Sequence, residues 1–338
     1  MRRSEALPLL AGMLIFALGG TMHPTTAGAQ DFCFNAAVDY ATAGGPFSVV
    51  AADLDGDGDA DLAVATRGWD NAVAVLKNNG DGTFAGAVRY QSGDGPSSVC
   101  AADLDGDGDI DLAVAVYGGN SIWVYKNYGD GTFALAVDYA AGGYPYFIVA
   151  SDLDGDGDAD LAVADYGSGD VSVLENNGNG TFTAPVQYAV VSSATCIVAA
   201  DLDGDNDPDL AVGTLGSDKI SVLMNNGDGT FAAAVNYAVG DGPNSVFAAD
   251  LDGDNDADLA VANWASDNVS VLKNNADATV RLQSTTRPGT GPSQSSRRSG
   301  RGQRCRLGSG QLGQRRCLGA DQLRSVPLSL PLPRRPAM

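Results

Sequence analysis

Short apolar segments alternate with polar turns along most of this chain, and none has the 3.6-residue period of an amphipathic helix. The segments FSVVAAD (residues 47–53), DLAVAT (61–66) and AVAVLK (72–77) have the length and the small or β-branched composition of strands. A fourth strand is predicted at 87–90, after the tight turn NGDG that starts at Asn79. The pattern therefore predicts a unit of four short strands joined by turns.

The same unit returns in steps of 49 or 50 residues, which is the sequence signature of a repeat architecture. Its NGDGTF turn recurs at Asn127, Asn177 and Asn226 and degenerates to NADATV at Asn275. Tandem four-stranded units without helices predict an all-β fold, a β-propeller with blades of about 49 residues and five complete blades. The ring would then be an incomplete six- or seven-bladed one. A flat solenoid is the alternative, but no polar cap is visible at either end.

The segment FNAAVDY at residues 34–40 copies the fourth strand of a unit, as in FALAVDY at 133–139, without the three strands that should precede it. We expect this orphan outer strand to close the ring on the last blade.

Each unit carries an acidic string such as DLDGDGDAD between its first two strands, with aspartate at positions 1, 3, 5, 7 and 9. Like charges this close repel one another unless a cation lies among them. Positions 1, 3, 5 and 9 would supply carboxylates, position 7 its main-chain carbonyl, and the glycine or asparagine at position 6 the turn. The predicted metal-binding residues are, repeat by repeat, Asp53, Asp55, Asp57, Asp59 and Asp61; Asp103, Asp105, Asp107, Asp109 and Asp111; Asp152, Asp154, Asp156, Asp158 and Asp160; Asp201, Asp203, Asp205, Asp207 and Asp209; and Asp250, Asp252, Asp254, Asp256 and Asp258.

Oxygen-only ligands in this spacing favour Ca²⁺, one ion per repeat and about five in all. An EF-hand is excluded because strands flank the loop and position 12 is Val64 instead of glutamate. The alternative is a solvated acidic turn without an ion, which gives no reason for the spacing to return five times.

The formal net charge of −22 argues against nucleic acid and anionic lipid as partners. The single histidine, His23, lies in the N-terminal segment, and Glu175 stands where other repeats carry lysine before the turn, so we expect no enzyme. Cys100 and Cys196 occupy non-equivalent positions and are interpreted as buried small hydrophobic residues without a disulfide.

The two ends differ from the repeats. Arg2 and Arg3, an apolar run at residues 9–18 and the small residues 27–29 predict a secretory signal peptide at 1–29, followed by the repeats at 30–280. No later apolar run is long enough for a membrane span, so the protein is expected to be secreted, extracellular or periplasmic. Residues 281–338 form a basic tail, predicted to be disordered. Reading the codons implied by 296–320 one base displaced permits a sixth acidic blade, so we interpret the tail as a frame-displaced sequence without a selected function.

The acidic loop, the repeat length and the NGDGTF turn resemble those of the FG-GAP/VCBS repeat family, whose propellers are related to the head of integrin α-subunits. The resemblance covers about residues 34–275. It implies a propeller with calcium loops and an extracellular adhesion or ligand-binding role, with a protein or glycan as partner. Aromatic residues that break the repeat would meet that partner: Trp69, Tyr117, Tyr144, Tyr146 and Trp264. For the two tryptophans, packing between blades is the alternative. Two other functions stay open, namely a polysaccharide lyase or hydrolase on a propeller scaffold and a truncated product without function.

Overall fold

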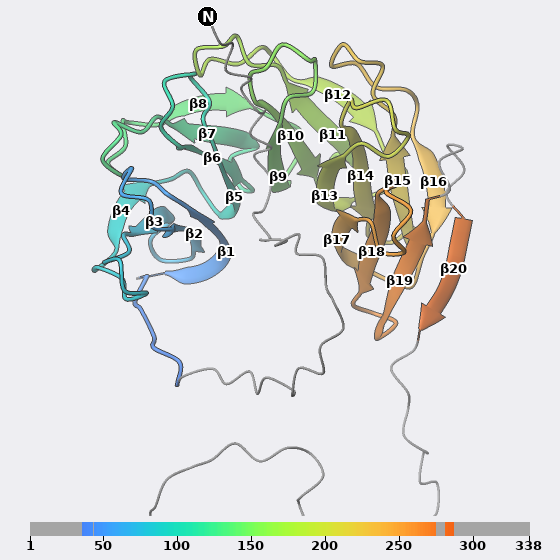
Figure 1. The fold of residues 1–338 in the computed structure, drawn as a ribbon, viewed down its shortest axis with the longest axis horizontal. Coiled ribbons are helices and arrows are strands. Elements are labelled where there is room, and N and C mark those ends of the chain that lie inside the picture. Colours follow the sequence, from blue (N-terminus) through green and yellow to red (C-terminus); the bar gives the residue numbers. More distant parts are fainter. Residues whose placement is uncertain (1–35, 43, 275–280, 287–338) are drawn as a thin grey trace, which may run out of the picture. The chain divides into compact units, whose positions relative to one another are not determined.

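Twenty β-strands and no helix make up the part of the chain described by the computed structural model, which is residues 36–42, 44–274 and 281–286 (Figure 1). All of the strands belong to one compact unit, whose main segment is Tyr40–Gly289. No helix among these residues is long and apolar enough to cross a membrane.

The strands form five antiparallel four-stranded sheets, each built from four consecutive strands in chain order, and we number the sheets 1 to 5 along the chain. Sheet 1 contains β1 (Gly45–Ala52), β2 (Asp61–Arg67), β3 (Ala72–Leu76) and β4 (Val88–Gln91). Sheet 2 contains β5 (Pro96–Ala102), β6 (Asp111–Val116), β7 (Ser121–Tyr125) and β8 (Val137–Ala140). Sheet 3 contains β9 (Pro145–Ser151), β10 (Asp160–Asp165), β11 (Asp170–Leu174) and β12 (Val186–Ala189). Sheet 4 contains β13 (Ala194–Ala200), β14 (Asp209–Thr214), β15 (Lys219–Leu223) and β16 (Val235–Ala238). Sheet 5 contains β17 (Pro243–Ala249), β18 (Asp258–Asn263), β19 (Asn268–Lys273) and β20 (Arg281–Thr286).

The predicted strands of the first unit match β1 to β4 to within two residues at each end. The NGDG turn is also present, because an isolated bridge joins Asn78 to Phe84 and three later turns repeat it. One boundary differs: β20 lies in the segment predicted as a tail, where it pairs with the otherwise open edge of β19. The remaining tail and the signal peptide lie outside the described residues.

The predicted orphan outer strand is not formed, and the expected closure of the ring on the last blade is wrong, because β20 occupies the edge of β19 that this strand would have joined. Residues 36–40 form no strand, and residues 34 and 35 lie outside the described part of the chain. Tyr40 nevertheless packs edge-on against Phe84, with ring centroids 5.4 Å apart. The same pair recurs between Tyr90 and Phe133 at 5.3 Å, where Tyr90 comes from the outer strand of the preceding sheet. The N-terminal segment therefore reproduces the aromatic contact of a missing neighbour without its strand pairing.

Neighbouring sheets pack through their first strands, since β1 contacts β5, β5 contacts β9, β9 contacts β13 and β13 contacts β17. Four apolar clusters each combine residues of two consecutive sheets. Small residues such as Ala63 and Ala113 are fully buried in them, which lets the strands approach closely. The core therefore lies between the sheets, and each sheet depends on its neighbours for burial.

The two end sheets each leave an apolar surface exposed. Val49 of β1 is 61% exposed, whereas Val99, which pairs at the same register position in sheet 2, is 6% exposed. At the other end Leu251 is 48% exposed, whereas Leu54 at the same loop position of sheet 1 is 1% exposed. A sheet with a neighbour on both sides therefore buries apolar side chains that remain exposed in the two end sheets.

A buried asparagine links each of sheets 2 to 5 to the sheet before it. The Asn176 side-chain amide donates to the carbonyl of Leu104 in the preceding sheet at 2.8 Å and to that of Ala159 in its own loop at 2.9 Å. Asn127, Asn225 and Asn274 make the corresponding bonds. Within the described residues, the side-chain amide of Asn78 in sheet 1 donates to the carbonyl of Ala60 in its own sheet and to no preceding sheet.

We predict that Asn176→Ala lowers the free energy of unfolding by roughly 2 to 4 kcal/mol, because it leaves the buried carbonyl of Leu104 and the partly buried carbonyl of Ala159 without their donor. Asn78→Ala is the matched control and should have a smaller effect, since its residue bonds no preceding sheet. Denaturant unfolding measures both variants. Equal losses would show that the bond between sheets contributes nothing.

Candidate cation-binding loops and a polar cavity

The five acidic strings form the loops between the first and second strands of the sheets. In each, the aspartate at position 1 folds the loop over itself: Asp53 Oδ1 accepts from the N–H of Gly56 at 2.9 Å and Oδ2 from that of Gly58 at 3.0 Å. Both glycines have positive φ, and Asn206 and Asn255 adopt it at position 6 of the last two loops. The predicted turn residue is confirmed, but the sequence argument missed the glycine at position 4.

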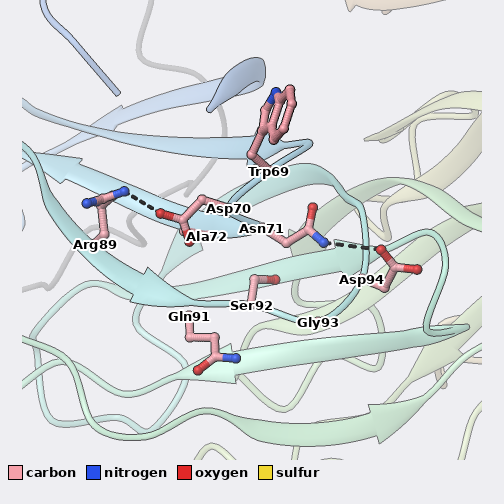
Figure 2. Close-up of a pocket in the computed structure, with 9 residues that line it drawn as sticks. All are labelled: Trp69, Asp70, Asn71, Ala72, Arg89, Gln91, Ser92, Gly93 and Asp94. Carbon is pink, nitrogen blue, oxygen red and sulfur yellow. Dashed lines mark hydrogen bonds and ion pairs between the residues drawn. The ribbon is translucent and has the colours of Figure 1, made fainter. Parts of the chain in front are cut away.

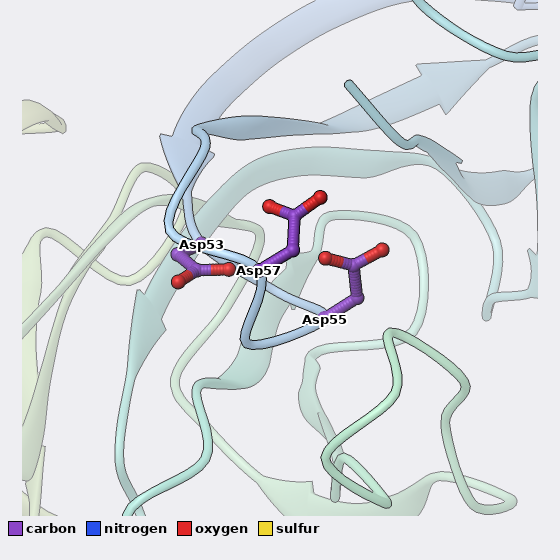
Figure 3. A group of neighbouring side chains, drawn as sticks. All are labelled: Asp53, Asp55 and Asp57. Carbon is purple, nitrogen blue, oxygen red and sulfur yellow. The ribbon is translucent and has the colours of Figure 1, made fainter. Parts of the chain in front are cut away.

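The carboxylates at positions 1, 3 and 5 converge in three of the loops, as Figure 3 shows for Asp53, Asp55 and Asp57. In each such group, one oxygen from every residue lies within 4.8 Å of the others. The loops of sheets 3 and 4 group positions 1, 3 and 9 instead. The groups, in chain order, are Asp53, Asp55 and Asp57; Asp103, Asp105 and Asp107; Asp152, Asp154 and Asp160; Asp201, Asp203 and Asp209; and Asp250, Asp252 and Asp254.

The aspartate at position 9 is fully buried and holds two elements together. Asp160 Oδ2 accepts from the N–H of Leu153 in its loop at 2.9 Å, and Oδ1 accepts from the N–H of Asn176 in the following turn at 2.7 Å. Burial raises the pKa of Asp160 to about 7, against the lowering effect of these bonds, and the nearby loop aspartates raise it further. Burial likewise raises the pKa of Asp111 and of Asp209 to about 6.

These observations fit a bound cation. The donors are oxygens only, they converge in every repeat, and Oδ1 of Asp55, of Asp105 and of Asp203 is buried without a hydrogen-bond partner. A divalent ion would relieve the desolvation and the mutual repulsion that raise these pKa values. Asp59 and its equivalents at position 7 belong to none of these groups. Each repeat therefore carries an aspartate cluster that could hold a metal ion.

In three of the five loops a lysine forms an ion pair with the aspartate at position 3, and this pairing was not predicted from the sequence. Lys126 lies with its ammonium nitrogen 3.1 Å from Asp105 Oδ2 and also donates to the carbonyl of Asn179 in the next sheet. Lys77 and Lys273 pair with position 3 of their own loops in the same way. Glu175 and Met224 occupy this place in sheets 3 and 4.

The pKa of the aspartate at position 3 differs between loops with and without this lysine. The hydrogen bond from Lys273 holds the pKa of Asp252 below its usual value. Burial, with neighbouring aspartates, raises the pKa of Asp154 and of Asp203, whose loops have no such lysine. The loops of sheets 3 and 4 therefore keep more uncompensated negative charge for a cation.

A polar cavity of about 620 Å³ lies beside the turn between β2 and β3. Figure 2 shows its lining, with the indole of Trp69 standing clear of the other side chains. Trp69 and Trp264 are largely or fully exposed, so the alternative that they pack between blades is wrong. Of the other aromatic residues singled out from the sequence, Tyr117 stacks on Tyr144 with centroids 4.8 Å apart.

A buried acid lies at the end of β10. Asp165 Oδ2 accepts from the Ser172 hydroxyl at 2.6 Å, while Oδ1 is buried without a partner. Burial raises the pKa of Asp165 to about 7. In sheet 5 the equivalent residue is Asn263, beside Ser270. The two cysteines in this part of the chain, Cys100 and Cys196, are free, in agreement with the prediction.

Four stretches of the chain, at residues 61–114, 103–163, 152–212 and 201–261, match the sequence model of the FG-GAP-like repeat. Together they cover residues 61–261, more than half of the chain. The chain belongs to the FG-GAP-like repeat family. No match is found among curated protein sequences.

Three solved structures illustrate what this FG-GAP-like chain is similar to. An Agrocybe aegerita lectin described as recognising non-reducing terminal N-acetylglucosamine is 24% identical with a TM-score of 0.49, over 69% of this chain and 65% of its own. The periplasmic gluconolactonase PpgL of Pseudomonas aeruginosa is 19% identical with a TM-score of 0.55, over 72% of this chain and 70% of its own. A protein of unknown function from Desulfotomaculum acetoxidans is 15% identical with a TM-score of 0.52, over 71% of each chain. The last two support the fold alone, so the five sheets are blades of a β-propeller.

The gluconolactonase corrects one prediction. The lack of a histidine outside the N-terminal segment led us to expect no enzyme, yet a propeller of similar structure is an enzyme. The prediction that this chain is no enzyme was wrong in its reasoning, because a propeller can assemble other side chains from several blades and one missing residue type does not exclude catalysis.

We predict that Lys126→Met, which copies Met224, tightens binding of a divalent cation at the loop of sheet 2 about five-fold, because a competing positive charge is removed from Asp105. NMR amide signals of Gly106 and Gly108, which bond Asp103, report this loop during a calcium titration. Lys219→Met removes the same charge from the start of β15, away from the loops, and should change nothing. Equal midpoints in both variants would contradict the role of Lys126.

A second prediction concerns pH. Because the folded-state pKa of Asp165 is raised from 3.8 to about 7, the folded state binds the extra proton between these values, and stability falls as the pH rises through this window. The Asp165→Asn variant lacks this titration, so as the pH rises from 4 to 8 its free energy of unfolding should increase by roughly 2 to 4 kcal/mol relative to that of the native chain. Denaturant unfolding at constant calcium measures it. Asp138→Asn, an exposed change that copies Asn236, is the control, and the same pH profile in both variants would refute the assignment.

Proposed function

We propose that this protein is a secreted calcium-binding β-propeller that acts as a binding module for an extracellular protein or glycan. The observation that carries the proposal is the convergence of aspartate carboxylates in all five loops. Calcium accepts six to eight oxygen ligands in flexible geometry, which suits carboxylates and a main-chain carbonyl from one loop. Magnesium retains its waters and takes such all-protein sites less readily.

In each loop the aspartates at positions 1, 3, 5 and 9 would hold the ion. A bound Ca²⁺ supplies positive charge that offsets the converging carboxylates. The chain's own contribution is to orient them: position 1 ties the loop through two N–H groups, and position 9 anchors it to the following turn. In sheet 2 this turn also carries Asn127, which bonds the loop of sheet 1. Loop order is therefore coupled to the packing of neighbouring blades.

Secretion is supported by the sequence of residues 1–29, with its basic start, apolar run and small residues before the expected cleavage site. Extracellular calcium modules bind the ion with Kd of about 10⁻⁴ to 10⁻³ M, which matches the concentration outside cells. The acidic surface makes nucleic acid and anionic membranes poor partners.

We predict that millimolar Ca²⁺ raises the melting temperature of the secreted chain relative to chelator, and more than Mg²⁺ does, because an ion that binds only the folded state stabilises it by mass action. Thermal melts by circular dichroism measure the effect. Asp107→Asn removes one converging carboxylate and should reduce the shift, whereas Asp138→Asn on the exposed outer strand should retain it. Identical melts in calcium, magnesium and chelator would refute the proposal.

A further inference from the structure

Two cavities adjoin at the junction of sheets 1 and 2 and share Asn71 and Asp94. We call the larger, of about 620 Å³, the Trp69 cavity and the smaller, of about 290 Å³, the Arg67 cavity. Asn71 forms the wall between them: its side-chain amide donates to Asp94 Oδ1 at 3.1 Å, and its Oδ1 accepts from the N–H of Gly68 at 3.2 Å (Figure 2). The polar groups of this wall are thus oriented without a ligand.

The turn that carries Trp69 departs from the repeat. In sheet 1 the residues that pair across this turn are Thr66 and Ala72. In sheet 2 they are Val116 and Ser121, which are one residue closer in sequence, and sheets 3 to 5 have the same shorter spacing as sheet 2. Sheet 1 therefore has one extra residue in this turn. The Trp69 indole in this longer turn is fully exposed and packs against no part of the core, which is an exposure that folding alone does not require.

The charges of the two cavities are unusual for this chain. Arg67 and Arg89 are the only arginines between residues 30 and 280, and one lines each cavity. Arg89 pairs with Asp70, and the guanidinium of Arg67 lies over the ring of Tyr117, 4.6 Å from its centre. With Asp94 the four charged side chains sum to zero, in a protein whose net charge is −22. The outer-strand position of Arg89 carries Asp138, Gln187 or Asn236 in the next three sheets.

This combination fits one class of ligand. The flat C–H face of a sugar ring is slightly positive and stacks on the negative face of an indole, as Trp69 offers. Sugar hydroxyls both donate and accept hydrogen bonds, and the cavities provide both partners: the Asp70 and Asp94 carboxylates accept, and the guanidinium of Arg89 and the amide of Gln91 donate. A polyanion would meet the repulsion of the acidic surface. A protein partner would be expected to find a packed apolar centre, which a single tryptophan among polar groups does not supply.

We infer that the two cavities form one site for a neutral oligosaccharide, with one sugar ring stacked on Trp69 and an adjoining unit in the Arg67 cavity. The inference rests on the proposed binding function and narrows its partner to an uncharged glycan. The Asn71 amide, held between both cavities, fixes the spacing of two consecutive sugar units.

The test is a calorimetric and tryptophan-fluorescence titration of the calcium-loaded full chain with chitotetraose, cellotetraose, mannotetraose and, as a charged comparison, tetragalacturonate. We expect binding of a neutral oligosaccharide, weakened about ten-fold or more by Trp69→Ala and unchanged by Trp264→Ala. Trp264 is the matched control because it is also an exposed tryptophan at the equivalent turn of sheet 5, distant in sequence from both cavities. Both variants should keep the native melting temperature, since neither side chain is buried.

Three outcomes would overturn the inference: no binding of any neutral oligosaccharide, equal binding by the Trp69→Ala variant, or preference for tetragalacturonate. Thermal melts of the same samples with calcium and with chelator test the calcium-binding proposal separately from the glycan site. A chain that is stabilised by calcium but binds no sugar refutes the glycan site alone. A chain that binds sugar through Trp69 without a calcium effect refutes the calcium-dependent propeller and leaves the glycan site standing.

Discussion

The buried aspartate at position 9 is the group on which the architecture depends. Asp111 accepts the N–H of Leu104 from its own loop and that of Asn127 from the next turn, so one carboxylate joins two elements of a sheet. Asn127 then donates to the carbonyl of Leu54 in the preceding sheet. Because a carboxylate without these donors would be costly to bury, loop, turn and neighbouring sheet must form together. The same three-part connection recurs in sheets 3 and 4 and in the described part of sheet 5.

Much of this fold could be predicted from the sequence because the strong signals are local. Strand limits follow from apolar segments of fixed length, and the loop from aspartate spacing with a residue that tolerates positive φ. The Asn127 bond to Leu54 was not predictable in this way, because its partner lies 73 residues away and depends on how sheets stack. The β20 strand was missed for a related reason: its sequence has lost the repeat pattern, and the open edge of β19 decides its pairing.

The candidate sites also combine features that local sequence predicts with features that depend on distant residues. Convergence at positions 1 and 3 was predictable, since alternate residues of a tight loop face one centre. The choice between positions 5 and 9 as the third group was not, because it accompanies the presence or absence of a lysine at the end of the third strand of the sheet, where sheet 2 has Lys126 and sheet 4 has Met224. The exposure of Trp69 likewise required the structure, since an aromatic residue near a turn can face a neighbouring sheet or the solvent.

The contact between Tyr40 and Phe84 covers part of the first sheet. One ring before β1 supplies the aromatic pair that a whole preceding sheet supplies elsewhere, so the first sheet has a partial end cap. Leu251 in sheet 5 remains half exposed within the described part of the chain. Val49 of β1 is also exposed, so each end sheet has a face without a neighbour, and local opening should be more frequent in sheets 1 and 5 than in the three sheets between them. Local stability should therefore be highest in sheets 2 to 4, which have a neighbour on both sides.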